Sequence, residues 1–167
     1  MHKYLLKPAL GTIKQTFFLE DDNGNIVYEG KMKKFSLFLA SPYSFTNFIT
    51  NKTEEHKIGK TITAEESGLA SMLSTKSYFK YDGKNIWDYL HEKGIRINST
   101  LSSDKIGMTH SISFEGKEIA TMKSTTPKGK SFITTNLYYD VFCDEKDLDL
   151  VFLVAFSIGK TNQTFYS

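Results

Sequence analysis

The sequence predicts a mostly β fold of the α+β class, in which strands pack around a buried hydrophobic helix near residues 147–159. Aromatic residues are abundant, with thirteen Phe and nine Tyr among 167 residues, and such side chains favour strands. An Asn, Asp or Glu followed by Gly recurs between strand-like runs, a pattern typical of β-hairpins. Residues 150–156 are apolar without interruption, which is typical of an element surrounded by protein.

The overall composition is that of an ordinary globular protein, and we expect residues 1–167 to form a single domain. Hydrophobic residues make up 40% and charged residues 24% of the chain, far from the composition of disordered proteins. No Ser/Gly linker, low-complexity tract or long charge block divides the sequence. The net charge of +2 is only weakly basic, so nucleic acid is not an expected partner.

The cellular location is predicted from the N-terminus, the apolar run and the cysteine. The first residues, MHKYLLKPALG, lack the apolar core of a signal peptide. The run at 150–156 is far shorter than the roughly 18 residues of a membrane span. Cys143 is the single cysteine, and a lone thiol suits a reducing compartment. We therefore expect a soluble cytoplasmic protein without a transmembrane segment, whose only membrane contact would be peripheral.

Strand-like segments fill the first half of the chain. A hairpin is predicted around the turn Asn23-Gly24, because Asn-Gly between two strand-like runs is a strong hairpin signal. The first segment is expected to be an edge strand that ends at Pro8. Residues 51–55 are expected to form a polar connection between two strands. The predicted strands of this half are residues 2–7, 14–20, 26–38, 43–50 and 56–64.

Two further hairpins and a short helix are predicted in the second half. The hairpins cover residues 78–90, with Asp82-Gly83 at the tip, and residues 111–124, with Glu115-Gly116 at the tip. Within the first of them, residues 85–93 favour a short helix, with Asn85 as N-cap and Gly94 as the stop. The remaining predicted strands are residues 94–101 and 131–142.

Residues 144–160 (DEKDLDLVFLVAFSIGK) predict the hydrophobic C-terminal helix. Acidic residues precede the apolar run, with Asp144 as a suitable N-cap, and Gly159 and Lys160 follow it, in agreement with the polarity of the helix macrodipole. Apolar side chains would cover all sides of this helix, so protein must surround it. A fully buried strand over residues 151–158 is the alternative, because periodicity does not distinguish short apolar runs. The length and the charged start favour the helix.

These features together resemble the tubby C-terminal-like superfamily, which includes phospholipid scramblases, plant LURP-one-related proteins and small bacterial single-domain proteins. The resemblance rests on repeated hairpins and on a Tyr-rich strand followed by an acidic turn and a hydrophobic helix. The segments concerned are DDNGNIVY at 21–28, YDGKNI at 81–86, FEGKEIATMK at 114–123, LYYDVF at 137–142 and LDLVFLVAFSIG at 148–159.

The resemblance implies a closed antiparallel β-barrel of about twelve strands around a central hydrophobic helix. Residues 84–101 would be an insertion between hairpins of the family, and residues 160–167 would extend past the helix. Tubby proteins bind phosphoinositides, and scramblases act on lipids with calcium. The phosphoinositide-contacting residues of tubby match no positions in this sequence, so the resemblance assigns no site residue.

No motif for catalysis, a cofactor or a metal occurs, so we expect neither an enzyme nor a cofactor or metal site. A nucleophilic Ser or Cys needs a base and an orienting group, and no G-x-S-x-G is present. Cys143 is followed by Asp144 and Glu145, which would raise the pKa of its thiol. The four His are isolated. The Gly-Lys-Thr segments at 59–61 and 159–161 lack the earlier glycine of a P-loop.

Small groups of lysines are the candidates for contact with an anionic ligand such as a lipid headgroup. Such groups attract phosphate-rich surfaces electrostatically. The more ordinary interpretation is that they cover solvated strand faces and loop tips, where they discourage edge pairing. The candidates are Lys31, Lys33, Lys57, Lys60, Lys128 and Lys130.

Three functional hypotheses follow. The first is a non-enzymatic binding domain that engages an anionic lipid headgroup or a protein partner through a basic face. The second is a carrier of small hydrophobic ligands, built like a lipocalin, which requires a hollow interior. The third is an enzyme whose site no motif reveals, because function belongs to sites rather than folds. The position of the hydrophobic helix distinguishes the first two hypotheses, because a helix that fills the interior leaves no room for a ligand there.

Overall fold

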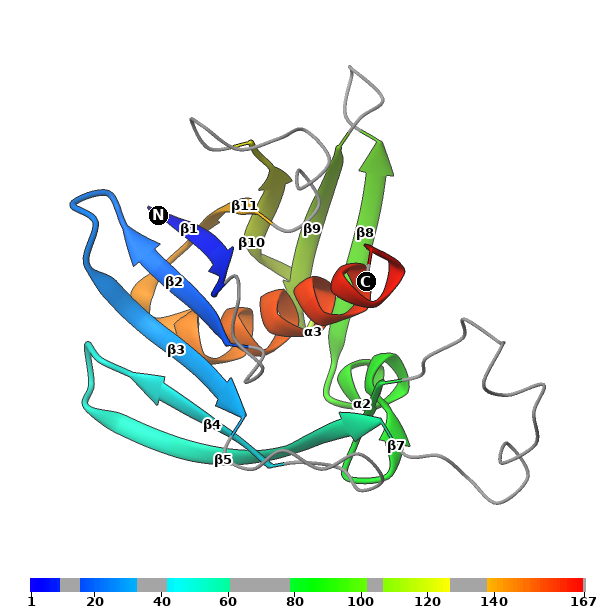
Figure 1. Cartoon of the computed structure of the whole chain (residues 1–167). Coiled ribbons are helices and arrows are strands. Elements are labelled where there is room, and N and C mark those ends of the chain that lie inside the picture. Colours follow the sequence, from blue (N-terminus) through cyan, green and yellow to red (C-terminus); the bar gives the residue numbers. More distant parts are fainter. Residues whose placement is uncertain (10–15, 33–41, 61–78, 102–106, 127–137, 167) are drawn as a thin grey trace.

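The computed structural model describes residues 1–9, 16–32, 42–60, 79–101, 107–126 and 138–166, which form a curved sheet around a long C-terminal helix (Figure 1). The helices are α2 (Ile86–Glu92), the short 3-10 helix η3 (Glu145–Asp147) and α3 (Leu148–Tyr166). The strands are β1 (His2–Pro8), β2 (Phe17–Asp21), β3 (Ile26–Met32), β4 (Pro42–Asn47), β5 (Lys52–Lys60), β6 (Phe79–Tyr81), β7 (Lys84–Asn85), β8 (Ile95–Leu101), β9 (Met108–Phe114), β10 (Lys117–Ser124) and β11 (Tyr139–Cys143).

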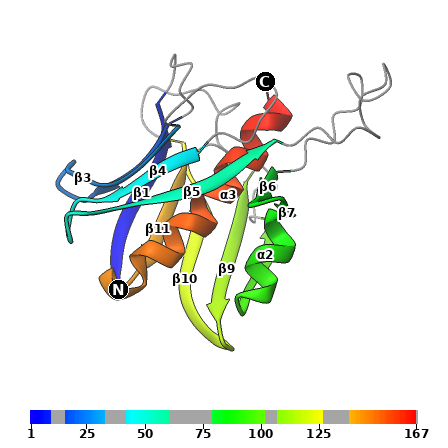
Figure 2. The same cartoon turned by 90° about the horizontal axis from the view of Figure 1, so that it is seen from below.

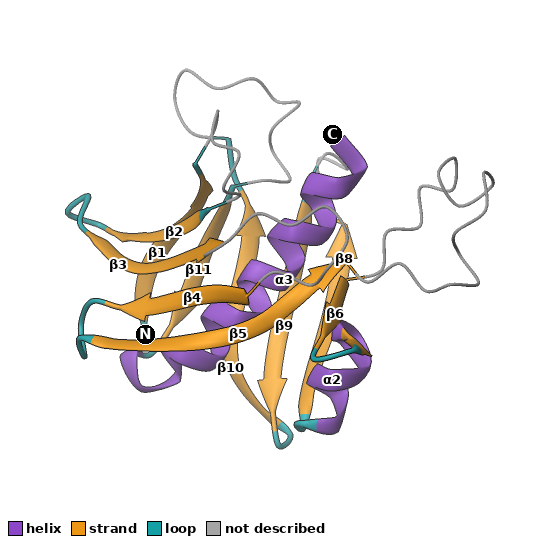
Figure 3. Ribbon diagram, turned by 60° about the horizontal axis from the view of Figure 1, so that its bottom comes forward, coloured by secondary structure: helices purple, strands orange, loops and turns teal. Residues whose placement is uncertain are grey.

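The sheet is antiparallel and open. The described strands follow the order β7-β6-β5-β4-β3-β2-β1-β11-β10-β9-β8, and within the described residues no pairing joins the two ends, β7 and β8. The mostly β fold with a C-terminal helix is confirmed, but the closed barrel of about twelve strands is wrong. The physical reason is visible in Figure 3: the chain between β7 and β8 forms α2, so a helix lies where a closing strand ladder would be needed.

The three predicted hairpin turns are present. Gly24 at the β2–β3 turn has a φ of 83°. The two-residue turns between β6 and β7 and between β9 and β10 have positive φ at both positions: 47° and 83° at Asp82 and Gly83, and 50° and 82° at Glu115 and Gly116. Such turns match the right-handed twist of the strands that they join. The residues of each turn are therefore sufficient to predict these three hairpin connections.

Two predictions on the N-terminal half are wrong. The segment at residues 2–7 is no edge strand, because β1 lies in the middle of the sheet and pairs with both β2 and β11. The predicted connection at 51–55 belongs mostly to β5, which begins at Lys52 and pairs with β4 as far as Lys57. Pairing between distant segments decides both outcomes, and composition does not reveal it. Residues 14–15, 33–38, 61–64, 78 and 131–137 of the predicted strands lie outside the described residues.

The hydrophobic segment is a helix, and it fills the concave side of the sheet. Residues 151–160 of α3 are all buried, and Figure 2 shows α3 enclosed between the β1–β5 side and the β9–β11 side of the sheet. The ring of Phe152 stacks on Tyr28 of β3 with 4.2 Å between ring centroids. Phe156 packs edge-on against Phe17 of β2 at 5.5 Å. The alternative of a buried strand at 151–158 is therefore wrong.

The bounds of α3 differ from the prediction at both ends. Asp144 makes no side-chain capping bond; its carboxylate instead lies 3.0 Å from the N-terminal amine of Met1, and the acidic segment forms η3. The helix also continues past Gly159 to Tyr166. Gly159 sits inside the helix, where the ring of Phe17 lies directly against its Cα. This glycine allows close packing and does not stop the helix.

Candidate functional site

The open seam of the sheet, between β7 and β8, is where α2 lies and where a pocket forms. The chain turns from β7 directly into α2, and Gly94 leads from α2 into β8. The helix therefore lies between the two ends of the sheet (Figure 3). Ile158 and Thr161 of α3 line a pocket together with residues of α2 and β8. We call the pocket between α2, β8 and α3 the seam pocket.

Local sequence explains why α2 begins and ends where it does. The side chain of Asn85 accepts a hydrogen bond of 2.9 Å from the backbone N–H of Trp87, which satisfies one donor of the first turn. Gly94 follows the helix with a φ of 86°, the left-handed conformation that glycine adopts without strain. The predicted short helix at 85–93, with its cap and its stop, is confirmed.

Two faces of α2 hold it in place against the molecule. Ile86 and Leu90 are buried in the common hydrophobic core. On another face, Tyr89 stacks on Tyr81 of β6 with 4.0 Å between ring centroids and 11° between ring planes. The hydroxyl of Tyr81 in turn lies 2.7 Å from Nδ1 of His56 on β5. Because packing on two sides fixes the helix, the wall that it gives to the seam pocket is formed before any ligand arrives.

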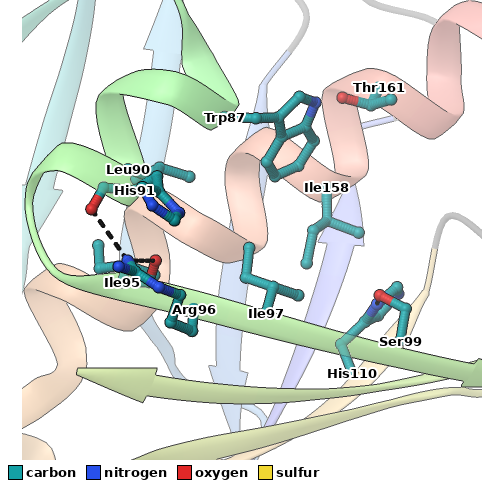
Figure 4. A pocket seen from close by; sticks show the side chains of 10 residues that line it. All are labelled: Trp87, Leu90, His91, Ile95, Arg96, Ile97, Ser99, His110, Ile158 and Thr161. Carbon is teal, nitrogen blue, oxygen red and sulfur yellow. Dashed lines mark hydrogen bonds between the residues drawn. The ribbon is translucent and has the colours of Figure 1, made fainter. Parts of the chain in front are cut away.

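The seam pocket has a volume of about 440 Å³, within the usual size range of small-molecule sites. Four of the residues that line it are buried, two are half-buried and four are exposed. Figure 4 shows how their side chains are arranged. Trp87 at the rim is the only Trp of the chain and keeps 38% of its surface exposed. The lining residues are Trp87, Leu90, His91, Ile95, Arg96, Ile97, Ser99, His110, Ile158 and Thr161.

A serine–histidine pair lies at one end of the seam pocket. Ser99 on β8 faces His110 on β9 in the strand register, and the Ser99 hydroxyl lies 2.8 Å from Nδ1 of His110. His110 is buried, which lowers the pKa of its imidazole and favours the neutral ring at neutral pH. Its other nitrogen, Nε2, has no hydrogen-bond partner within the described residues. The same nitrogen is shielded from solvent.

Within the described part of the chain, the same pair has no acidic residue of the kind that completes a catalytic triad. In a catalytic triad an acidic side chain binds the second nitrogen of the histidine and orients the ring. Here Nε2 of His110 has no such partner among the described residues, and no Asp or Glu lines the pocket. The pair can donate and accept hydrogen bonds, and it offers no orienting group for a nucleophile.

Arg96 marks the other end of the seam pocket. Its Nη1 donates hydrogen bonds of 3.0 Å each to the backbone oxygens of His91 and Ile95, so the guanidinium is held over the C-terminal end of α2. Figure 4 places Arg96 and His91 at one side of the lining and Ser99 and His110 at the other, with Ile97 between them. With Arg96 as a cation and no acid among the described residues of the lining, the pocket favours negative charge.

The predicted lysines do not form one basic face in the part of the chain that can be described. Lys31 on β3 and Lys57 on β5 are exposed. The register places Lys31, Ser44 and Glu55 in one row across β3, β4 and β5, so an acid shares that surface. The amine of Lys57 lies 3.8 Å from the Asp82 carboxylate. The side chains of Lys33, Lys60, Lys128 and Lys130 lie outside the described residues.

The sequence interpretation missed every residue of the seam pocket. One local signal existed, since His110 is buried and alternates with the buried Ile112 on β9, whereas its neighbour Ser99 on β8 is exposed. Polar residues on an inward face call for a partner. That the two would face each other depends on the β8–β9 register, which the sequence does not give.

The chain matches no family model, no curated protein and no solved structure. None of the helices described is long and apolar enough to cross a membrane. Across the described ranges, no group of three His, Cys, Asp or Glu side chains is placed to hold a metal ion.

Proposed function

We propose that this protein is a non-enzymatic binding domain that holds a small, largely apolar molecule in the seam pocket. The observation that carries the proposal is the pocket itself, a preformed cavity of about 440 Å³ with an apolar centre and polar groups at its ends. Small-molecule sites are typically of this kind, mostly apolar with few polar groups that fix orientation.

The position of α3 supports this site over a lipocalin-like interior. A central ligand cavity would have to occupy the space that the buried residues of α3 fill. At the seam, α2 replaces a strand ladder and its side chains do not fill the gap completely. The carrier hypothesis is therefore proposed in a changed form, with the ligand beside α3 and α2.

A basic lipid-binding face, our first expectation, has weaker support. Lys31 shares its outer surface with Glu55, and Lys57 lies near Asp82, so positive charge is not concentrated there. The resemblance to the tubby C-terminal-like superfamily stays a prediction. Vesicle flotation with and without anionic lipid would test the lipid-binding version, and binding only to anionic vesicles would favour it.

The proposal is tested with the intrinsic fluorescence of Trp87 and the neutral apolar probe N-phenylnaphthylamine. Because Trp87 is the only Trp and lines the pocket, energy transfer from its indole to the probe reports binding in its neighbourhood, and two variants locate the binding site. Ser99→Phe places a ring inside the pocket, whereas Thr100→Phe places the same ring on the opposite face of β8. We expect Ser99→Phe to weaken probe binding about tenfold, roughly 1.4 kcal/mol, and Thr100→Phe to leave it unchanged.

Urea unfolding of both variants verifies that they fold. Absence of energy transfer in the natural chain would refute the proposal. Equal probe affinity of the natural chain and a folded Ser99→Phe would refute it as well, since the probe would then bind elsewhere.

A further inference from the structure

We infer that the ligand of the seam pocket is a small monocarboxylic acid, with its carboxylate at Arg96 and an apolar body along the centre of the pocket. This inference rests on the proposed function and adds the chemical class of the ligand. Three features of the described lining carry it: a guanidinium held in place at one end, an apolar centre, and a far end without charged groups.

The guanidinium of Arg96 presents two donors that fit the two oxygens of a carboxylate. Both hydrogen bonds that the described residues give this side chain start from Nη1 and end on the backbone oxygens of His91 and Ile95. The N–H groups of Nε and Nη2 lie side by side on another edge of the planar group. Two parallel donors of this kind bind a carboxylate in a bidentate manner. Because Nη1 is engaged, the guanidinium is oriented before a ligand arrives.

The charge of the lining selects an acid over an amine and over a neutral molecule. Arg96 lines the pocket, and no Asp or Glu does so among the described residues. An anionic group gains a counter-ion at Arg96, whereas an amine meets the same cation without a compensating acid. Arg96 is itself exposed, so the gain is that of a solvated ion pair, up to about fivefold in affinity.

The far end of the pocket selects a ligand with a single carboxylate. There the Ser99 hydroxyl lies 2.8 Å from Nδ1 of His110, and Nε2 of His110 is shielded from any ligand. Among the described residues of the lining, this end has no Lys or Arg, so a second carboxylate would lose water without gaining a counter-ion. A phosphate group at Arg96 would likewise bring almost two negative charges to one cation.

The centre of the pocket holds the apolar body of the ligand. Trp87, Ile97 and Ile158 lie between the two ends (Figure 4), and burial of methylene groups against them provides the non-specific part of the affinity. At about 30 Å³ for a water-sized group, a cavity of about 440 Å³ holds about fifteen non-hydrogen atoms. The space therefore fits an acid of medium chain length.

The test is displacement of N-phenylnaphthylamine by five ligands with the same eight-carbon chain: octanoate, octanol, octylamine, octylphosphonate and octanedioate, which carries a second carboxylate. A purely apolar pocket would bind octanol more tightly than octanoate, because the carboxylate is more strongly hydrated. We expect the opposite, with octanoate about fivefold tighter than octanol. Octylamine and octanedioate should bind more weakly than octanoate, and octylphosphonate no more tightly. Titrations at about pH 8 keep ordinary imidazoles neutral.

The preference for octanoate over octanol should also depend on salt. The Debye length falls from about 30 Å at an ionic strength of about 0.01 M to about 3 Å at about 1 M, which screens an exposed ion pair. We expect the preference to fall from about fivefold to less than about twofold over this range. A preference that salt leaves unchanged would overturn the ion pair with Arg96.

Three variants assign the preference to Arg96. Arg96→Gln should abolish it and leave the affinity for octanol within about twofold. The matched control Lys93→Gln should keep it, because the Lys93 amine lies over the Tyr89 ring, 5.5 Å from its centre, and Lys93 does not line the pocket. Arg96→Lys keeps the charge without the paired donors, so the preference should fall to about twofold. This variant decides the matter if Arg96→Gln also loses octanol, and a full preference in Arg96→Lys would overturn bidentate binding.

The outcomes separate this inference from the proposed function. If the probe fails to bind at all, both are overturned. If the probe binds but octanol displaces it as well as octanoate does, or no ligand displaces it, the proposed function stands and the monocarboxylic acid is overturned. Tighter binding of octanedioate or octylphosphonate than of octanoate would overturn it as well. A preference for octanoate that survives in Arg96→Gln, or disappears in Lys93→Gln, would overturn the assignment to Arg96.

Discussion

Gly159 of α3 lies against the ring of Phe17 on β2, so that a Cβ atom at position 159 would come within 2.6 Å of Cε1 of that ring. Both residues are buried, and the helix reaches the sheet this closely only without a side chain. The contact explains why a glycine stands within a helix, where it normally costs about 1 kcal/mol relative to alanine.

Replacing this glycine should destabilise the protein in spite of the better helix propensity of alanine. For Gly159→Ala we expect a loss of about 1–3 kcal/mol in the free energy of unfolding, because the Phe17 ring must move within a packed core. Urea denaturation measures the change. In a chain that already carries Phe17→Leu, the same substitution should be much less harmful. An equal loss in both backgrounds would contradict the contact.

Asp149 is expected to anchor the start of α3 through two hydrogen bonds. Its Oδ1 accepts from the hydroxyl of Tyr28 at 2.7 Å and from the side-chain amide of Asn47 at 3.0 Å. Asp149→Ala leaves two donors without this acceptor and should lower the free energy of unfolding by about 1–2 kcal/mol. Asp88→Ala is the matched control, since it also removes an exposed acid from a first helical turn. If both variants lost a similar amount of free energy of unfolding, the interaction of a negative charge with the helix dipole would explain the loss, and the two hydrogen bonds would not.

Lys160 should make stability depend on pH in the alkaline range. Burial lowers the pKa of its amine from 10.5 to about 7, and the amine lies 5.8 Å from the centre of the Tyr43 ring. Between pH 7 and the ordinary pKa of 10.5 the unfolded chain holds this proton and the folded chain releases it. The contribution of Lys160 to the free energy of unfolding is therefore fully present above pH 10.5, where its amine is neutral in both states. This contribution is lost as the pH falls towards 7.

We expect the free energy of unfolding to rise between pH 7 and pH 9 by up to about 1.4 kcal/mol per pH unit. In Lys160→Met this slope should disappear. Lys146→Met removes an exposed lysine and should keep the slope. The measurement stays below pH 9, the ordinary pKa at which the thiol of Cys143 is half ionised in the unfolded chain. A slope that persists in Lys160→Met would show that other groups cause it.

Cys143 is expected to be unreactive in the folded protein. Burial, and after it the negative charges of the Asp147 and Asp144 carboxylates, raise the pKa of its thiol to about 12. Alkylation by iodoacetamide at pH 8 should therefore be slow in buffer and fast in urea, because the thiolate is the reactive form. Mass spectrometry gives both rates. Comparable rates in the two conditions would contradict the burial of this residue.

The elements that could be predicted are those with a local cause. The turns at Asp82-Gly83 and Glu115-Gly116 need positive φ, and the residues that favour it stand there. Asn85 and Gly94 bound α2 by capping and by backbone freedom. In each case the deciding interaction joins residues close in sequence, so pattern and propensity are sufficient evidence.

Other features could not be predicted, because distant segments decide them. The central place of β1 depends on its pairing with β11, and the close contact of Gly159 within α3 is made with Phe17, which is distant in the sequence. The acidic residues before α3 looked like a first helical turn, yet Asp144 pairs with the N-terminal amine.

The sequence by itself determined that strands joined by tight turns would enclose one hydrophobic helix, since turn chemistry and an all-apolar helix leave few alternatives in water. Only the tertiary structure decided that the sheet stays open at β7 and β8 and that His110, Ser99 and Arg96 border the gap. Strand register and helix packing bring these residues together, and both depend on contacts between segments that the linear order of residues does not specify.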